Sequence, residues 1–107
     1  MGLFTRTPKT DPASVAARVP GRGVLVIDVR QPHEYRHGHI RGSHNVPLSQ
    51  LARRMERIPR DLPVVTVCAS GHRSAAAARM LLSAGYDVEN LAGGISAWSR
   101  AGLALSR

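Results

Sequence analysis

The single cysteine of this sequence, Cys68, stands between an apolar segment and an alanine-rich segment. Residues 64–67, immediately before it, form a continuous run of apolar or β-branched side chains, which predicts a strand buried on both faces, as in parallel sheets. After a short turn, residues 74–82 are mostly good helix formers, and Gly85 can cap the end of that helix. We therefore expect Cys68 to lie where a central strand leads into the N-terminus of a helix.

Such a position would make the thiol of Cys68 reactive. Ligands bind at the carboxyl ends of strands in open α/β sheets, and the N–H groups of a turn and a helix start attract anions. A thiol in these surroundings has a pKa of roughly 3.5–7.5 instead of about 8.5. Arg73 adds a permanent cation nearby and His72 a second possible one. We predict a nucleophilic thiolate; the alternative is an inert buried thiol, the commonest fate of a free cysteine.

Three groups of residues resemble the signatures of rhodanese domains, in the same order along the chain. The N-terminal signature is resembled by residues 28–35 (DVRQPHEY), 38–43 (GHIRGS) and 45–47 (NVP). Residues 68–74 (CASGHRS) resemble the active-site loop, and the C-terminal signature is resembled by residues 91–95 (LAGGI) with Ala97, Trp98 and Gly102. The resemblance covers about residues 22–103.

The resemblance implies an α/β, rhodanese-like three-layer fold. Alternating strand-like and helix-like segments independently predict a mostly parallel sheet of about four or five strands, with helices on both faces. We expect one domain over residues 1–107, in which residues 1–10 are a loosely ordered lead-in. The resemblance also implies that the turn at Gly93 and Gly94 lies near the catalytic loop as a wall of the pocket.

The loop between Cys68 and Arg73 is short, with four intervening residues. The cysteine phosphatases, and the related phosphatases and arsenate reductases of this fold, have one residue more. A tetrahedral phosphate or arsenate needs a wider cradle, because three oxygens must each meet backbone donors. The shorter loop favours a single sulfane sulfur on Cys68. A phosphatase or arsenate reductase stays as an alternative, as does a non-catalytic binding or regulatory module that reuses the fold.

The function we predict is a thiosulfate sulfurtransferase of the rhodanese type. Cys68 would carry sulfane sulfur as a persulfide, from thiosulfate or a persulfide donor to a thiophilic acceptor, which is cyanide in vitro and a thiol or protein cysteine in the cell. Backbone N–H groups of the loop would stabilise thiolate and persulfide, and no metal or organic cofactor is needed. Besides Cys68, the predicted active-site loop residues are Ala69, Ser70, Gly71, His72 and Arg73, and the predicted supporting residues are Asp28, Arg30, Arg41 and Ser74.

Charged side chains near the N-terminal signature are expected to shape the pocket. A second predicted buried strand, residues 24–29, brings Asp28 to the same sheet edge as Cys68, where it should accept hydrogen bonds from the neighbouring loop or a nearby arginine. Arg30 and Glu34 are four residues apart and could pair locally, whereas Arg30 and Arg41 could line the pocket mouth. His33, His37, His39 and His44 lack the spacing of a zinc site, which favours hydrogen-bonded structural or surface histidines.

Composition and charge narrow the remaining possibilities. The 107 residues give room for one modest core. The sequence has no apolar run of about eighteen residues and nothing that resembles a signal peptide. We therefore expect a cytoplasmic protein that is not in a membrane. The net charge is +8, and Arg53, Arg54, Arg57 and Arg60 cluster in one segment. Nucleic-acid binding lacks supporting aromatic or motif signals, so we favour steering of small anions or docking of an acidic partner, in a monomer or weak dimer.

The remaining elements are predicted from caps, turns and periodicity. Their expected ranges are a helix over residues 12–18 capped by Thr10 or Asp11, one helical turn opened by Pro32, a strand over 43–46, a helix over 49–57 capped by Ser49 with Leu51, Met55 and Ile58 buried, a strand over 86–91, a helix over 95–101 with Trp98 in the core, and a short N-terminal strand over 3–5.

Overall fold

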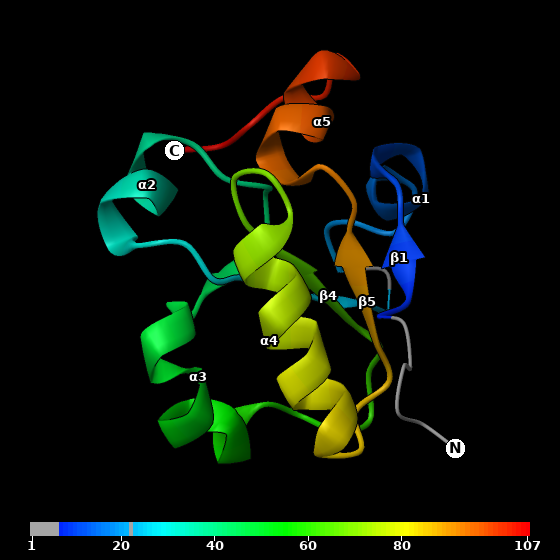
Figure 1. The fold of residues 1–107 in the computed structure, drawn as a ribbon. Helices are drawn as coiled ribbons and strands as arrows, with labels where there is room; N and C mark the ends of the chain where they lie inside the picture. The colour runs from blue at the N-terminus through cyan, green and yellow to red at the C-terminus, as the bar shows by residue number, and fades with distance from the viewer. Residues whose placement is uncertain (1–6, 22) are drawn as a thin grey trace.

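The structure, a computed structural model, describes residues 7–21 and 23–107. Its strands form one parallel sheet in the order β1-β5-β4-β2-β3 (Figure 1). The strands are β1 (Lys9–Thr10), β2 (Leu25–Asp28), β3 (His44–Asn45), β4 (Val64–Val67) and β5 (Val88–Leu91). The helices are α1 (Pro12–Ala16), α2 (Pro32–His37), α3 (Leu48–Arg54), the 3-10 turn η1 (Met55–Arg57), α4 (His72–Ser83) and α5 (Gly94–Arg100).

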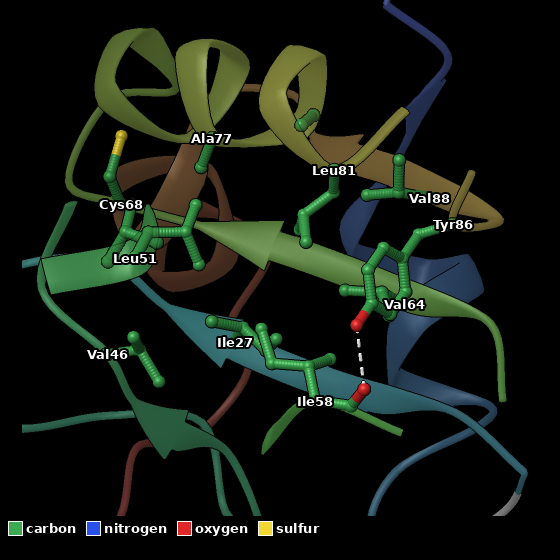
Figure 2. Close-up of a cluster of buried hydrophobic side chains, with 12 residues drawn as sticks. Ile27, Val46, Leu51, Ile58, Val64, Cys68, Ala77, Leu81, Tyr86 and Val88 are labelled. Carbon is green, nitrogen blue, oxygen red and sulfur yellow. Dashed lines mark hydrogen bonds between the residues drawn. The ribbon is translucent and has the colours of Figure 1, made fainter. Parts of the chain in front are cut away.

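Two hydrophobic clusters fix helices to opposite faces of this sheet. On one face, Leu51 of α3 and Leu81 of α4 pack with Ile27 in a cluster that also includes Cys68 (Figure 2). On the other, Val15 of α1 and Trp98 of α5 pack with core residues of β2 and β4. All four residues of β4 are buried, because this central strand is covered on both faces. The predicted α/β architecture with helices on both faces of a parallel sheet is confirmed.

The register of the central strands brings the site residues to one edge of the sheet. Asp28 pairs with Val67, so β2 and β4 end at the same level. Cys68 follows Val67 directly, and Gly71 then forms the N-cap of α4 with a φ of 105°, a left-handed conformation that glycine adopts without a steric penalty. The helix therefore begins at His72, two residues before the predicted start. The helix ends at Ser83, and the predicted terminating glycine, Gly85, follows the C-cap Ala84 with a φ of 92°.

The segment after β3 corrects one predicted cap. The helix begins at Leu48, directly after Pro47, and no side-chain hydrogen bond caps it, so the assignment of Ser49 as the cap is wrong. Pro47 lacks an N–H and has a φ already suited to a helix start. Leu51 and Ile58 are buried as predicted, and Met55 is partly buried.

The N-terminal region also differs from the prediction. Lys9–Thr10 is an ordered edge strand that pairs with Asn90 and Leu91 of β5, so these two residues are not part of a loose lead-in. Residues 3–5, for which a strand was predicted, lie outside the described part of the chain. Asp11 caps α1 as expected, because its Oδ1 accepts a hydrogen bond from the N–H of Ser14 at 2.8 Å.

The shorter elements also keep close to their predicted positions. α1 ends at Ala16, two residues before the predicted end, and Trp98 is buried as expected. Among the helices of residues 7–21 and 23–107, none has the length and apolar composition needed to cross a membrane.

Candidate active site

The sulfur of Cys68 lies inside a cradle of hydrogen-bond donors. The N–H of Gly71 donates to Sγ at 3.0 Å, the N–H of Ser74 at 3.3 Å and the Oγ–H of Ser74 at 3.2 Å. These donors come from the loop and the first turn of α4, whose N–H groups have no partner earlier in the helix. The loop thus surrounds a sulfur atom with groups that stabilise negative charge.

This cradle determines the acidity of the thiol. Burial of Cys68 opposes its ionisation and raises its pKa, because the thiolate loses contact with water. The hydrogen bonds from the Ser74 hydroxyl and from the backbone N–H groups of Ser74 and Gly71 act in the opposite direction and outweigh burial. The pKa of Cys68 therefore lies below its ordinary value, in the direction that the sequence predicted.

The Gly93–Gly94 turn and the first turn of α5 pack directly against this loop. The N–H of Ile95 donates to the carbonyl of Cys68 at 2.9 Å, and the N–H of Ser96 donates to the carbonyl of Ala69 at 3.0 Å. A Cβ on Gly94 would lie 2.2 Å from the Cys68 carbonyl oxygen, so only glycine permits this approach. The expectation that the Gly93–Gly94 turn lies beside the loop is confirmed, and α5 anchors the loop through its backbone.

Arg73 extends across the loop to α2. Its Nη1 and Nη2 donate to Glu34 Oε1 and Oε2 at 2.8 and 3.0 Å, a bidentate pair that leaves 37% of the Arg73 side chain exposed. The hydrogen bonds from Arg73 lower the pKa of Glu34 to about 2, and Glu34 in turn raises the pKa of Arg73. The predicted local pairing of Glu34 with Arg30 is wrong, because the tertiary fold offers Glu34 a second arginine in better geometry.

Arg30 instead forms a buried ion pair with Asp28. Its Nε and Nη2 donate to the carboxylate of Asp28 at 2.8 to 3.1 Å, and Nη2 also donates to the carbonyl of Gly38 at 2.7 Å. The two residues are only 6% and 1% exposed. Asp28 therefore accepts hydrogen bonds from a nearby arginine as expected. Arg30 does not line an open pocket mouth, because its guanidinium is buried and hydrogen-bonded to Asp28 of β2 and to Gly38 at the end of α2.

Two buried polar residues that sequence reasoning did not single out support the loop from below. Asn90 of β5, 4% exposed, donates from Nδ2 to the carbonyl of Gly71 at 3.2 Å. Thr66 of β4 is fully buried and donates from Oγ1 to the carbonyl of Ser74 at 2.9 Å. Both contacts reach the residues whose N–H groups meet the sulfur. For Thr66, its place in an otherwise apolar strand was the available signal, since buried polar groups are rarely without a partner. Asn90 gave no such signal, because Glu89 precedes it in the same strand.

The other predicted site residues are spread around the loop. Ser70 and His72 are exposed, and Ser70 Oγ lies 3.1 Å from His72 Nδ1. Arg41 is exposed in the turn after α2, and no recorded hydrogen bond within the described residues joins it to the loop, so its place at the pocket mouth stays a prediction.

The clustered histidines have local hydrogen bonds. His37 Nδ1 lies 2.6 Å from the carbonyl of His33, and His39 stacks on Tyr35 while its Nδ1 meets the Tyr35 carbonyl at 2.8 Å. Across residues 7–21 and 23–107, no three or more His, Cys, Asp or Glu side chains are grouped as metal ligands would be. His37 and His39 therefore have the local hydrogen-bonded roles that the prediction favoured.

The structure is thus that of an α/β protein with a cysteine, surrounded by hydrogen-bond donors, at the carboxyl end of the central strand of a parallel sheet. The sequence model of the Rhodanese-like domain matches residues 11–101. The chain therefore belongs to the family of rhodanese-like domains.

Individual relatives agree with this assignment. A protein of Allochromatium vinosum named "Sulfurtransferase" is 44% identical over 81 residues, which are 75% of this chain and 76% of that protein. "Thiosulfate sulfurtransferase GlpE" of Stutzerimonas stutzeri is 32% identical over 91 residues, 84% of either chain. With a further relative from Bacillus subtilis, the alignments cover 62% to 84% of the relatives' own lengths.

A crystal structure gives the same result for the fold. The rhodanese-related protein from Thermoplasma volcanium superposes with a TM-score of 0.87 at 31% identity, over 92% of this chain and 97% of that one. The chain is thus a rhodanese-like domain whose relatives include proteins named as sulfurtransferases.

Proposed function

We propose that this protein is a sulfurtransferase that carries sulfane sulfur on Cys68. The observation that carries the proposal is the set of three donors, from Gly71 and Ser74, aimed at the Cys68 sulfur. Such a cradle holds a thiolate, which is the nucleophilic form of cysteine. Relatives named as sulfurtransferases, one of them a thiosulfate sulfurtransferase, support this chemistry over a purely structural thiol.

In the first half of the reaction, the Cys68 thiolate attacks the outer sulfur of thiosulfate or a similar sulfane donor. A sulfur–sulfur bond forms to Cys68 while the sulfur–sulfur bond of thiosulfate breaks, and sulfite leaves with the bonding electron pair. The negative charge moves from Cys68 to the terminal sulfur of the persulfide. The loop N–H groups meet this charge at close range without reorganising, as donors do in an oxyanion hole.

In the second half, a nucleophile attacks the terminal sulfur of the persulfide. Cyanide would leave as thiocyanate, and a thiol or protein cysteine would leave as a persulfide, with the electron pair returned to Cys68 as thiolate. The sequence has no second cysteine, so the acceptor must come from outside the chain. The cradle of Cys68 is then ready for another donor.

Arg73 would provide the positive charge that attracts the anionic donor. Its side chain is 37% exposed beside the loop, and Glu34 fixes its guanidinium with two parallel hydrogen bonds. Glu34 is then a positioning residue, because it acts on the donor through Arg73. The net charge of +8 adds a field that raises the local concentration of small anions.

The decisive experiment is an intact-mass measurement of the reduced protein after brief incubation with thiosulfate. We expect a gain of one sulfur atom, which cyanide removes as thiocyanate and which Cys68→Ser never acquires. Absence of this gain with thiosulfate and other sulfane donors, while Cys68 is readily alkylated, would contradict the proposal. Hydrolysis of p-nitrophenyl phosphate or reduction of arsenate by the same sample would then favour the phosphatase or arsenate reductase.

A further inference from the structure

The edge strand β3 is too short to cover its neighbour β2. β3 pairs with β2 only at Ile27 and Asp28, through His44 and Asn45, so the first half of β2 has no strand partner from β3. An open cavity of about 280 Å³ remains there, between the start of β2, β3 and the segment that ends α3. It lies near the amino ends of the strands, because Leu25 in its wall pairs with Val64, whereas Cys68 follows the carboxyl end of β4.

This cavity combines an apolar floor with a basic rim. Ile27, Val46 and Ile58, which lie together in the core cluster (Figure 2), are 1%, 7% and 7% exposed and form its floor. Arg54 and Arg57 stand at its rim. None of the described residues that line the cavity carries a carboxylate, so no acidic side chain there neutralises the two arginines.

The two arginines differ in how they are held. Arg54 Nη1 donates to Gln50 Oε1 at 3.2 Å, which fixes its guanidinium along α3. Arg57 is exposed, and the ion pairs found within the described residues do not include it. A free guanidinium beside an apolar cavity can receive a carboxylate through two parallel N–H···O bonds.

We propose that this cavity binds a small amphipathic carboxylate, with its hydrocarbon part on Ile27, Val46 and Ile58 and its carboxylate on Arg57. The volume is near the lower end of small-molecule sites, which start at roughly 300 Å³, so a chain of medium length fits better than a large ring system. The net charge of +8 opposes a second copy of this chain as the occupant, since two such molecules repel each other. A polynucleotide would leave the apolar floor unused.

The test is a titration of the ¹⁵N-labelled full chain with decanoate below its micelle concentration, followed through the backbone amide signals. Decylammonium and acetate serve as matched probes, because the first keeps the chain with the opposite charge and the second keeps the head without the chain. We expect saturable shifts around Leu25, Val46 and Ile58 with decanoate, and binding at least tenfold weaker with either matched probe.

Two charge-reversal variants separate a built site from general attraction. Arg57→Glu removes the rim cation, and Arg53→Glu makes the same change of charge on an exposed α3 residue that does not line the cavity. We expect Arg57→Glu to weaken decanoate at least tenfold and Arg53→Glu less than twofold, with Arg57→Gln and Arg53→Gln as a milder pair. Equal losses in each pair, shifts confined to other surfaces, or no saturation would overturn the proposal.

Discussion

Two arginine–carboxylate pairs flank the end of the sheet, and they differ mainly in burial. In the pair of Arg30 with Asp28, the side chains are 7% and 1% exposed, whereas in the pair of Arg73 with Glu34 they are 37% and 27% exposed. A buried pair strongly penalises the loss of one partner, while an exposed pair contributes little to stability. The same chemistry is therefore structural in the first pair, whereas the second pair stays partly exposed beside the loop, where we propose that Arg73 attracts the anionic substrate.

The thiol of Cys68 adds a third case to this comparison. It is 1% exposed, as Asp28 is, but its hydrogen-bond partners are N–H and O–H groups of Gly71 and Ser74 instead of a guanidinium. Neutral hydrogen-bond donors stabilise the thiolate without forming a fixed ion pair, which an incoming sulfur substrate would have to break. The sulfur of Cys68 is thus solvated by neutral donors, whereas the buried carboxylate of Asp28 is held by a cation.

Removing the buried cation should have the largest effect on stability. Arg30→Ala leaves the carboxylate of Asp28 buried and the carbonyl of Gly38 without its donor, so we expect the free energy of unfolding to fall by about 3–5 kcal/mol. Urea denaturation followed by circular dichroism measures this loss. A decrease below about 1 kcal/mol, the range of exposed pairs, would show that burial does not distinguish the two arginines.

Removing one neutral donor from Cys68 should change its acidity. Ser74→Ala deletes the hydroxyl that donates to the sulfur, so we expect the pKa of Cys68 to rise, because the thiolate loses one of the hydrogen bonds that stabilise it. The pH dependence of iodoacetamide alkylation gives this pKa. Asn90→Ala, which loses the support of Gly71, should shift it in the same direction by less. An unchanged profile in Ser74→Ala would refute the cradle as the cause.

Removing the positive charge of Arg73 beside the active-site loop should affect activity more than stability. We expect Arg73→Ala to change the free energy of unfolding by about 1 kcal/mol or less, because the pair is partly exposed to solvent, which screens it. Loss of a charged hydrogen bond to the donor should lower kcat/KM for thiosulfate by roughly tenfold to a hundredfold. Glu34→Gln should raise KM more than it lowers kcat, since it disturbs only the position of Arg73. Equal kcat/KM in wild type and Arg73→Ala would remove Arg73 from the proposed mechanism.

The smallest expected effect is a pH dependence of the stability that the pair of Arg73 with Glu34 contributes. The pKa of Glu34 is lowered from 4.5 to about 2, so its ionised form is stabilised by folding. This contribution is complete above about pH 4.5 and is lost as the pH falls toward about 2. The difference in unfolding free energy between wild type and Glu34→Gln should therefore be constant near neutrality and shrink within that acid window. A difference that already shrinks between pH 7 and pH 5 would contradict this assignment.

The sequence alone determined the elements whose signals are local. The apolar run before Cys68 predicts β4, and the helix formers after it, with Gly85, predict α4. These signals are local, because each depends only on neighbours along the chain. The family resemblance likewise rests on short motifs, and these motifs include Cys68 and its loop. Asp11 as a cap and Trp98 as a core residue follow from the same kind of local rule.

Only the tertiary structure decided which distant groups meet. Glu34 stands at helical spacing from Arg30, yet it pairs with Arg73, thirty-nine residues away, while Arg30 pairs with Asp28 two residues before it. Asn90 and Thr66 support the loop because parallel pairing places β5 and β4 beneath it, which no local pattern encodes. Lys9–Thr10 becomes a strand only because β5 offers an edge to pair with. Hydrogen bonds and ion pairs across the sheet depend on register and packing, and these are properties of the whole fold.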